Sequence, residues 1–342
     1  EGEASGRGLL ARRAIAQDAE LVRLPLRLCL TKEAALATLG AGGAVDAATN
    51  EYVAIALLLI HERARGAASF WAPYLAVLPT LDDVSPTFAW TDDELDALRG
   101  SPCLAATLSM RAKLAAEYAA FVTENPGLSD ADKRDTYTKA AWDWAFAVLF
   151  SRAIRLGAPR RGELLALVPY VDFVNHSPFS ASYVGLEDAP ATLFPWDDPA
   201  RDAEVVLVAD RAYKPYDQVF ISYGPKSNAE LLLLYGFALD RNPFNAVDVK
   251  FRVRDADDPL AAAKRAFAEA CGLAAEAAFP LYADRFADEM LQFLRMLCVT
   301  PDDLAAARVA TLDDLDFSRR VSWDNEIRVL ETVADACDSA LA

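Results

Sequence analysis

The order of strand-like and helix-like stretches is the feature that most constrains the fold of this chain. Short runs rich in β-formers, punctuated by Pro25 and glycines, precede a long stretch with helical periodicity, and the same order then repeats once. Strands and helices therefore come in blocks rather than in βαβ alternation, and no glycine-rich turn of the dinucleotide-binding type follows a strand. This order predicts an α+β fold in which a helical block interrupts a small β domain and a helical domain follows it.

The same pattern predicts the bounds of the elements and of four segments. We expect strands at 8–11, 20–24, 28–30, 165–174, 203–209 and 218–223, and the main helices at 52–65, 91–100, 104–124, 133–156 and 324–341. The expected segments are the first part of the β core at 1–49, the helical insert at 50–164, the second part of the β core at 165–254 and the helical domain at 255–342.

The net charge limits the partners that the chain is expected to bind. Lys and Arg number 34 against 51 Asp and Glu, so the formal net charge is −17. A surface this acidic repels phosphate backbones, which disfavours DNA and RNA, whereas a basic peptide or a lysine-bearing tail would be attracted. The simpler interpretation is that the charge keeps an alanine-rich protein soluble. No apolar run reaches the length of a membrane span, so no membrane association is expected.

Cysteines and histidines are too few and too scattered to indicate a metal site. The five cysteines include no Cys-x-x-Cys pair, and His61 and His176 are the two histidines of the chain. Structural zinc sites need closely spaced thiolates, and their absence from this pattern predicts a protein that holds no metal. Scattered cysteines also fit a reducing compartment better than a disulfide scaffold.

The first candidate site lies where a strand-like run ends in polar residues. The run contains Asp172, leads into Asn175 and His176, and ends at Pro178. An amide and an imidazole at this position offer hydrogen-bonding groups to a ligand. A plain turn is the alternative, and these residues alone favour it, because Asn and Ser are common in turns and a single His is usually packed.

The second candidate site is a pair of tyrosines at the ends of two elements. Ser227 and Glu230 form a capping box that begins a helix at 228, and Gly236 is the natural residue to end it after two turns. Tyr235 therefore lies at the terminus of a short helix beside a glycine, and Tyr223 follows a strand beside another glycine. Two phenols placed in this way could line a slot. Two core tyrosines with satisfied hydroxyls are the alternative.

Two further segments carry weaker signals for ligand binding. Gly6-Arg7-Gly8 enters the first strand, and its glycines would let the backbone approach a ligand closely, although such a tripeptide is more often a plain turn. Ser151-Arg152 lies near the end of a predicted helix, where an arginine among apolar residues needs an anionic partner such as a ligand carboxylate. An exposed or snorkelling arginine is the equal alternative.

Taken together and in this order, these segments resemble the SET-domain methyltransferases, and in particular the group of plant Rubisco large-subunit lysine methyltransferases. The resemblance spans nearly the whole chain. It implies an α+β fold made of a SET-domain β core with a knot-like crossing, a helical insert and a C-terminal all-α substrate-binding domain. The stretches that carry it are 6–13, 151–153, 172–176, 226–231 and 235–237.

The resemblance also implies a cofactor, a reaction and a role for each candidate residue. The cofactor would be S-adenosylmethionine, and the reaction would transfer its methyl group to a lysine side chain of a protein substrate. Tyr235 would be the catalytic tyrosine, and no metal would take part. The cofactor-binding residues would be Gly6, Arg7, Gly8, Arg152, Asn175 and His176, and the residues lining the lysine channel would be Ser151, Asp172, Tyr183 and Tyr223.

The chemistry of this reaction sets requirements that the site must meet. The displacement at the methyl carbon is in-line, so alignment supplies much of the rate. The lysine amine must arrive neutral, and a narrow apolar channel beside a cationic methyl donor lowers its pKa. Tyr235 would orient the amine, and Asp172 would be an orienting acceptor for the substrate rather than an obligatory base.

Two departures from the family pattern concern the substrate side of the site. Relatives often carry a second arginine after the Ser-Arg run, and Arg155 is out of that register, so its part in the site stays open. Relatives also often carry another tyrosine about a dozen residues past the Tyr-Gly-Phe run, where this chain has Val247 and Asp248.

Two other functions are the alternatives. A histidine methyltransferase of the same fold, as in the actin-directed branch, is disfavoured because that branch lacks the tyrosine that Tyr235 supplies here. A non-catalytic protein-binding module is disfavoured because Tyr235 and Asn175-His176 are all present. The resemblance suggests the Rubisco large subunit or another chloroplast protein as substrate, and hence the chloroplast stroma, with the cytoplasm and nucleus as other locations. The oligomeric state and the number of methyl groups added stay open.

Overall fold

Two compact units make up the chain, Glu1–Asn242 and Pro243–Ala342. The computed structural model describes residues 7–125, 128–158, 162–187, 203–253, 258–270 and 274–298. Of the candidate site residues, Gly6 lies outside the described residues. The other candidates all belong to the first unit, so one unit carries the whole candidate site.

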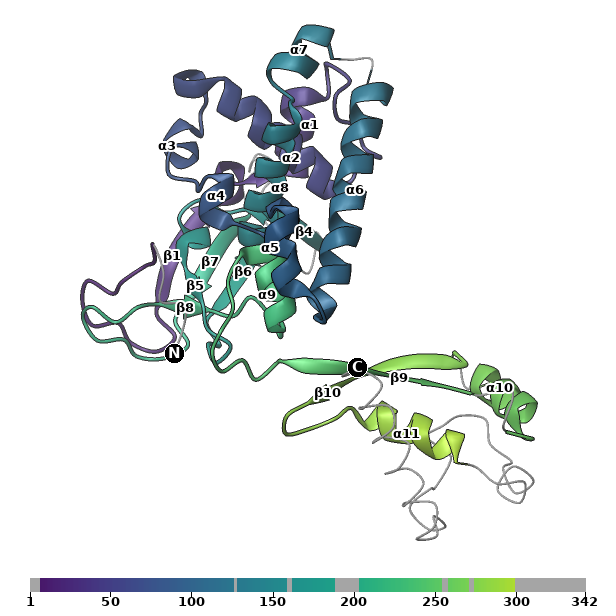
Figure 1. Cartoon of the computed structure of the whole chain (residues 1–342). Helices are drawn as coiled ribbons and strands as arrows, with labels where there is room; N and C mark the ends of the chain where they lie inside the picture. Colours follow the sequence, from purple (N-terminus) through teal and green to yellow (C-terminus); the bar gives the residue numbers. More distant parts are fainter. Residues whose placement is uncertain are drawn as a thin grey trace, which may run out of the picture. The chain divides into compact units, whose positions relative to one another are not determined.

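Strands far apart in the sequence pair to form the β core of the first unit (Figure 1). One antiparallel sheet has the order β1-β7-β6 and another the order β2-β4-β3, so strands from both sides of the helical insert complete each other's hydrogen bonds. This is the split β core that the sequence predicts. The strands are β1 (Glu20–Pro25), β2 (Leu30–Thr31), β3 (Ile154–Ala158), β4 (Gly162–Leu167), β5 (Asn175–His176), β6 (Tyr183–Glu187), β7 (Glu204–Val208) and β8 (Phe220–Ile221).

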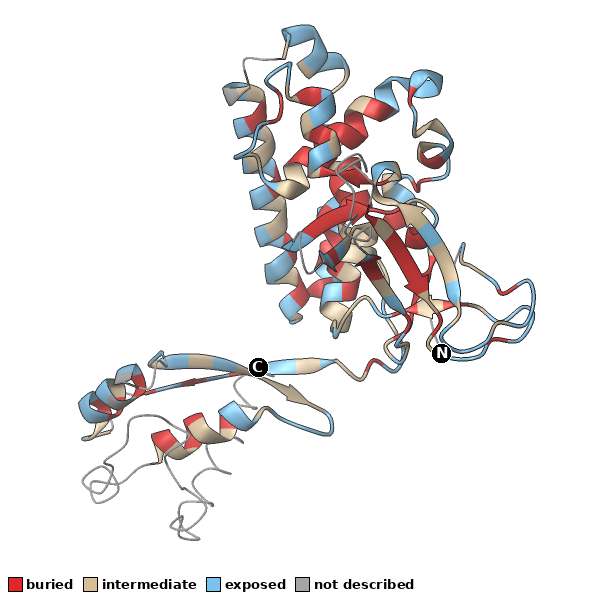
Figure 2. Cartoon of the chain, turned by 180° about the vertical axis from the view of Figure 1, so that it is seen from behind, coloured by how far each residue is buried: buried red, intermediate tan, exposed pale blue. Residues whose placement is uncertain are grey.

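The helices of the first unit gather on one side of these strands and enclose a buried core (Figures 1 and 2). Residues 53–60 of helix α2 are all apolar, and Leu57, Leu58 and Leu59 are at most 1% exposed in a cluster that also contains Trp142 and Phe146 of α8. Burial of this apolar surface is the main stabilising contribution to the insert. The helices are α1 (Lys32–Leu39), α2 (Glu51–Ala64), α3 (Ala72–Leu75), α4 (Leu81–Val84), α5 (Asp92–Leu95), α6 (Pro102–Glu124), α7 (Asp130–Asp135), α8 (Lys139–Arg152) and α9 (Asn228–Tyr235).

The predicted helix at 133–156 is wrong as a single element. The stretch contains the end of α7, a break, α8 and then the first residues of β3. Thr138 begins α8, since its side chain accepts a hydrogen bond from the Ala141 N–H at 3.1 Å, and Ala153 ends the helix in an extended conformation. Residues 154–158 then pair with β4. The prediction failed here because the pairing with β4, which follows later in the sequence, cannot be seen in the local helical periodicity.

The predicted strand at 165–174 is also shorter than expected. β4 ends at Leu167, and Tyr170 adopts a left-handed conformation with φ +75°. A 3₁₀ helix, Val171–Phe173, follows and leads into β5. This turn brings Asp172 to Arg152 of α8, while Val171 stays buried against residues of β3 and β4.

The second unit contains strands as well as helices among its described residues. The sequence predicts helix throughout 255–342, but Glu276–Tyr282 forms strand β10, which pairs antiparallel with β9 (Ala246–Arg252). Phe279 of β10 contacts Phe251 of β9 and Phe293 of α11, so long-range packing overrides the local helical preference. The helices are α10 (Ala261–Ala270) and α11 (Asp288–Leu297). The predicted helix at 324–341 lies outside the described residues.

The two motif segments meet in a parallel pair of short strands. Asn175 of β5 lies opposite Phe220 of β8, and His176 lies opposite Ile221. The chain then runs from β8 through Tyr223 into α9. The two segments therefore lie side by side, as the resemblance implies. None of the described helices is long and apolar enough to cross a membrane.

Candidate active site

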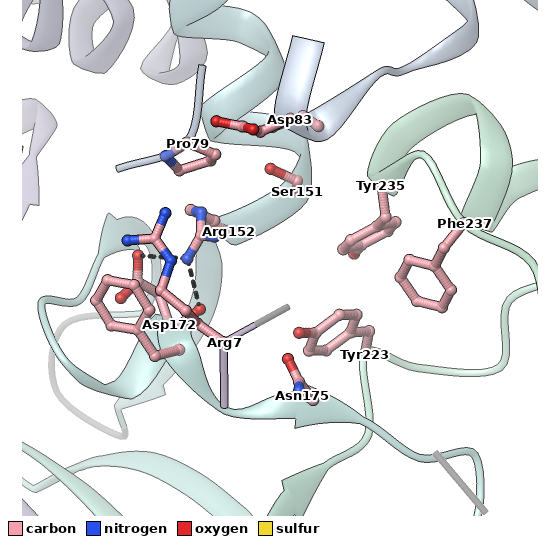
Figure 3. Close-up of a pocket in the computed structure, with 12 residues that line it drawn as sticks. Arg7, Pro79, Asp83, Ser151, Arg152, Asp172, Asn175, Tyr223, Tyr235 and Phe237 are labelled. Carbon is pink, nitrogen blue, oxygen red and sulfur yellow. Dashed lines mark hydrogen bonds and ion pairs between the residues drawn. The ribbon is translucent and has the colours of Figure 1, made fainter. Parts of the chain in front are cut away.

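Two pockets in the first unit share one wall. The Asn175 pocket has a volume of about 360 Å³ and is shown in Figure 3. The Gly224 pocket has a volume of about 280 Å³. The residues common to both are Ser151, Arg152, Asp172, Tyr223 and Tyr235. Ligands placed in the two pockets would therefore be separated only by these side chains.

Tyr235 is held at the C-terminal end of α9. The predicted capping box is present, since Ser227 accepts a hydrogen bond from the Glu230 N–H and the Glu230 carboxylate accepts one from the Ser227 N–H. Gly236 ends the helix with φ +77°, and a Cβ there would lie 1.7 Å from the Val84 carbonyl oxygen. Glycine is therefore required next to Tyr235 both for its conformation and for its close approach to the insert.

The Tyr235 hydroxyl is protonated and available to a ligand. Burial raises the pKa of Tyr235 to about 12. Among the described groups, none is hydrogen-bonded to this hydroxyl, and the side chain lines both pockets. A neutral O–H group in a partly desolvated wall can donate to, or accept from, a group that enters either pocket.

Tyr235 belongs to a stack of three rings. Its ring centroid lies 4.9 Å from that of Tyr223, and the Tyr223 ring lies 4.9 Å from that of His176, with interplanar angles of 18° and 22°. The Tyr223 hydroxyl donates to the Val174 carbonyl oxygen at 2.9 Å, and its backbone N–H donates to His176 Nδ1 at 3.0 Å. Burial lowers the pKa of His176, which favours the neutral imidazole that this acceptor role requires. The crossing of the two segments thus fixes the position of the Tyr235 ring.

Arg152 and Asp172 form a buried ionic pair in the shared wall. Arg152 Nη1 donates to the Asp172 carbonyl oxygen at 3.0 Å and lies 3.6 Å from its carboxylate Oδ2. The Tyr74 hydroxyl donates to the same Oδ2 at 2.7 Å. Burial raises the pKa of Asp172 to about 6, although Arg152 and Tyr74 act in the opposite direction. Arg152 Nε and Asp172 Oδ1 are buried without a hydrogen-bond partner among the described residues.

Gly8 allows two amides to approach the backbone at the edge of the Asn175 pocket. A Cβ at Gly8 would lie 2.2 Å from Gln218 Nε2 and 2.7 Å from Asn175 Nδ2. Arg7 lines the same pocket, and its Nη1 donates to the Val77 carbonyl oxygen of the insert at 2.9 Å. The N-terminal segment, the β core and the insert therefore meet at this pocket.

Most of the predicted site residues that the structure describes lie together. Arg7, Asn175 and the five shared residues line the Asn175 pocket, and Gly8 lies close to the Asn175 amide. His176 lies behind Tyr223 and lines neither pocket. Tyr183 lies apart from both pockets, on β6, where its side chain is 62% exposed and covers Gly185.

The structure adds residues of the insert to the site that the sequence did not indicate. Pro79, Asp83 and Val84 line the Asn175 pocket, and Tyr74 reaches Asp172. No local pattern marks these positions, because they lie on the short helices α3 and α4 and the turn between them. Arg155, whose role the sequence left open, lines the Gly224 pocket. No group of three or more metal-ligating side chains occurs in the described part of the chain.

Two sets of relatives are similar to this chain over nearly its whole length. It is 31% identical over 350 residues to the ribulose-1,5-bisphosphate carboxylase/oxygenase large subunit N-methyltransferase of Pisum sativum, which covers 98% of this chain and 67% of that protein. It is 28% identical over 344 residues to the actin-histidine N-methyltransferase of Gallus gallus, which covers 96% of this chain and 55% of that protein. The chain thus spans about two thirds of the pea protein and about half of the chicken protein.

Solved structures and a family match agree with these relatives. The SET domain of LSMT bound to lysine and AdoHcy matches with a TM-score of 0.75 at 28% identity, over 99% of this chain and 75% of that one. Rubisco LSMT bound to AdoMet matches with a TM-score of 0.72 at 27% identity, over 99% and 75%. Residues 255–342 match the Rubisco LSMT substrate-binding family. The predicted SET-domain fold is confirmed, and the chain belongs to the Rubisco LSMT family of SET-domain protein methyltransferases.

Proposed function

We propose that this chain is a protein-lysine N-methyltransferase. Members of its family are S-adenosylmethionine-dependent protein methyltransferases, and the chain is one of them. The identity to the pea Rubisco enzyme is 31% and that to the chicken actin-histidine enzyme is 28%, so sequence similarity does not distinguish a lysine from a histidine target. The choice of lysine rests on the chemistry of the two pockets.

The residues of the Asn175 pocket fit S-adenosylmethionine. Arg152 presents a guanidinium group whose buried Nε has no partner among the described residues, which suits the amino-acid carboxylate of the cofactor. The rings of Tyr235 and Phe237 line the pocket and offer aromatic surface to a cation, whereas the Tyr223 ring is stacked between His176 and Tyr235. The absence of a side chain on Gly8 leaves room for the Asn175 amide at the pocket edge. When bound, S-adenosylmethionine supplies a methyl group on a positively charged sulfur.

The Gly224 pocket suits a lysine side chain. Ile154, Val174 and Ile221 provide apolar lining for an aliphatic stem. Arg152, Arg155 and Asp172 line the same pocket, so two guanidinium groups face one carboxylate, and the excess positive charge disfavours the protonated ammonium form and lowers the pKa of an entering amine. The pocket therefore favours the neutral amine, which is the nucleophile that methyl transfer needs.

Tyr235 carries the proposal. Its protonated hydroxyl lies in the wall that separates the two pockets, and among the described groups none is hydrogen-bonded to it. We assign to it the orientation of the lysine amine towards the Asn175 pocket. Its ring position is fixed by the stack on Tyr223, so little reorganisation is needed when substrate enters.

The other shared residues hold this arrangement in place. The Ser151 hydroxyl donates to the Ala147 carbonyl oxygen at 2.7 Å and lines both pockets with its remaining acceptor capacity. The Asp172 carboxylate is engaged by Tyr74 and Arg152, so we assign it to holding Arg152 rather than to contacting the lysine. Tyr183 lies apart from the pockets and is not part of the proposed site.

The test is the Tyr235→Phe variant. We expect turnover to fall by about 10²–10³-fold, in the range of a lost orienting hydroxyl, with the cofactor dissociation constant within about twofold of the parent. Transfer of labelled methyl groups to Rubisco large subunit and to a protein extract would measure turnover, and calorimetry would measure cofactor binding. Tyr216→Phe is the matched control, since Tyr216 is 81% exposed and lines neither pocket.

The outcomes separate the candidate functions. Unchanged turnover in Tyr235→Phe would remove Tyr235 from the mechanism. A product whose methyl group maps to histidine by mass spectrometry would overturn the lysine assignment in favour of the actin-directed type of activity. A protein that binds no cofactor would point to a non-catalytic binding module. Methylation of Rubisco large subunit would in addition support a location in the chloroplast stroma.

A further inference from the structure

The helical insert reaches into the site through one buried tyrosine. Tyr74 lies on α3, is 7% exposed, and donates its hydroxyl to Asp172 Oδ2 at 2.7 Å across 98 positions of sequence. A buried hydroxyl on a short helix of this kind needs a partner, and hydrophobic packing alone would be served equally well by phenylalanine. The hydroxyl therefore has a use in the structure beyond packing.

Asp172 passes this contact on to Arg152. Arg152 Nη1 is bound to the Asp172 carbonyl oxygen at 3.0 Å and lies 3.6 Å from the oxygen that Tyr74 holds. The guanidinium also lies over the Phe173 ring, 5.1 Å from its centroid. Figure 3 shows that Arg152 lies between Asp172 and the side of the pocket that Tyr235 lines. The orientation of Arg152 thus depends on a carboxylate whose own orientation depends on Tyr74.

The segment that carries Tyr74 is anchored at several other points. The Trp144 indole N–H donates to the Pro79 carbonyl oxygen at 2.9 Å, and Arg7 binds the Val77 carbonyl oxygen at 2.9 Å. Gly236 lies against the Val84 carbonyl oxygen. Because the segment 74–84 is held at Val77, Pro79 and Val84, the Tyr74 hydroxyl has a fixed position relative to the pocket.

We propose that Tyr74 is a positioning residue for cofactor binding, which acts by holding Asp172 so that Asp172 holds the guanidinium of Arg152. This inference rests on the proposed function, because it takes Arg152 as the partner of the cofactor carboxylate. It gives the insert a direct part in cofactor affinity. The insert is then a component of the active site as well as a covering layer.

The ionisation of Asp172 provides a readout of this role. The charged and titratable groups that face Asp172 are Arg152 from α8, Tyr74 from α3 and Cys29 before β2. Burial raises the pKa of the Cys29 thiol to about 12 and that of Tyr74 well above its usual value, so both are neutral and Tyr74 remains a donor. The Tyr74 hydrogen bond favours the ionised carboxylate. Removal of this hydrogen bond raises the pKa of Asp172 above about 6. As the pH falls, the carboxylate is then protonated, and its ionic pair with Arg152 is lost, at a higher pH than in the parent chain.

The experiment measures S-adenosylhomocysteine binding by calorimetry at pH 6.0, 7.0 and 8.5 for the parent chain and for Tyr74→Phe. We expect the dissociation constant of the variant to be about tenfold higher at pH 6.0–7.0, with the difference falling to about twofold at pH 8.5, where Asp172 is ionised in both proteins. A difference that is equal at all three pH values would show a packing effect only, and would overturn the proposal, as would an unchanged dissociation constant.

Two further variants complete the design. Tyr137→Phe is the matched control, because Tyr137 is also a buried tyrosine of the insert and lines neither pocket. Its hydroxyl lies 3.3 Å from His61 Nδ1. The Tyr137→Phe variant should bind S-adenosylhomocysteine as the parent chain does at each pH. Asp172→Asn removes the titrating group, so adding Tyr74→Phe to it should change binding by less than about twofold. A full tenfold effect in that background would overturn the proposal even if Tyr74→Phe alone is poorly folded. A parent chain that binds no cofactor would instead overturn the proposed function.

Discussion

The close approach between Gly236 and the insert predicts a large effect of one added methyl group. In Gly236→Ala, the new Cβ would lie 1.7 Å from the Val84 carbonyl oxygen, and the two must separate by about 1.3 Å to reach 3.0 Å, below which such contacts essentially do not occur. Both groups are backbone, so no side-chain rotation relieves the overlap. The end of α9 must move away from α4, and Tyr235 moves with it.

The magnitude follows from two separate contributions. An alanine in the left-handed conformation, at φ +77°, costs about 1–2 kcal/mol. The lower entropy of the unfolded chain offsets about 0.4–1 kcal/mol of this cost, which leaves about 1 kcal/mol. The overlap with Val84 adds about 2 kcal/mol, as for an overpacked core. We therefore expect a net loss of about 3 kcal/mol for Gly236→Ala.

Gly100→Ala is the matched control. Gly100 also has a positive φ, +80°, but a Cβ there would meet nothing within 4 Å. Its loss should be about 1 kcal/mol, from conformation alone. For a unit of this size each kcal/mol lowers Tm by about 2–4 °C, so scanning calorimetry should give a fall of about 6–12 °C for Gly236→Ala and about 2–4 °C for Gly100→Ala. Turnover should fall at least tenfold in Gly236→Ala only. Equal Tm changes in the two variants, or normal turnover in Gly236→Ala, would refute the reasoning.

Two further predictions concern the Asn175 pocket and the buried carboxylate. Gly8→Ala should raise the cofactor dissociation constant at least about tenfold with a small change in Tm, because its Cβ displaces the amide ends of Gln218 and Asn175 rather than backbone. Gly157→Ala is the control and should bind the cofactor normally, since its Cβ would meet nothing within 4 Å. Equal binding by both variants would contradict the role of Gly8. The folded-state pKa of Asp172 is raised to about 6 from 3.8, so its stabilising contribution is present at low pH and lost as the pH rises through 6. Relative to Asp172→Asn, the parent should therefore lose on the order of 1 kcal/mol of unfolding free energy between pH 5.0 and 7.5, measured by urea denaturation, and parallel curves for the two proteins would rule out the raised pKa.

Features that depend on neighbouring residues could be predicted from the sequence. The bounds of α9 follow from the capping box of Ser227 and Glu230 and from Gly236, since all of these contacts lie within a few positions of one another. Helix α2 could be predicted in the same way from its apolar density. The motif segments identified the family because they combine in a specific order. These local signals placed Tyr235 at the end of its helix before any tertiary contact was known.

Features that depend on distant partners could be decided only by the tertiary structure. Residues 154–158 form a strand because β4 pairs with them, and Glu276–Tyr282 does so because β9 lies opposite, although the local periodicity of both stretches reads as helix. The resemblance implies that Tyr183 lines the lysine channel, but Tyr183 is exposed and lies apart from both pockets.

The active site also combines features set by neighbouring residues with features set by distant partners. The sequence by itself determined the residue types that a methyl-transfer site needs and the helix terminus that presents Tyr235. The tertiary structure decided which groups surround them: the ring stack behind Tyr235, and the hydrogen bond between Tyr74 and Asp172. The physical reason is that capping and periodicity act over three or four residues, whereas burial, ion pairing and pKa depend on groups that folding brings together from positions as far apart as 74 and 172.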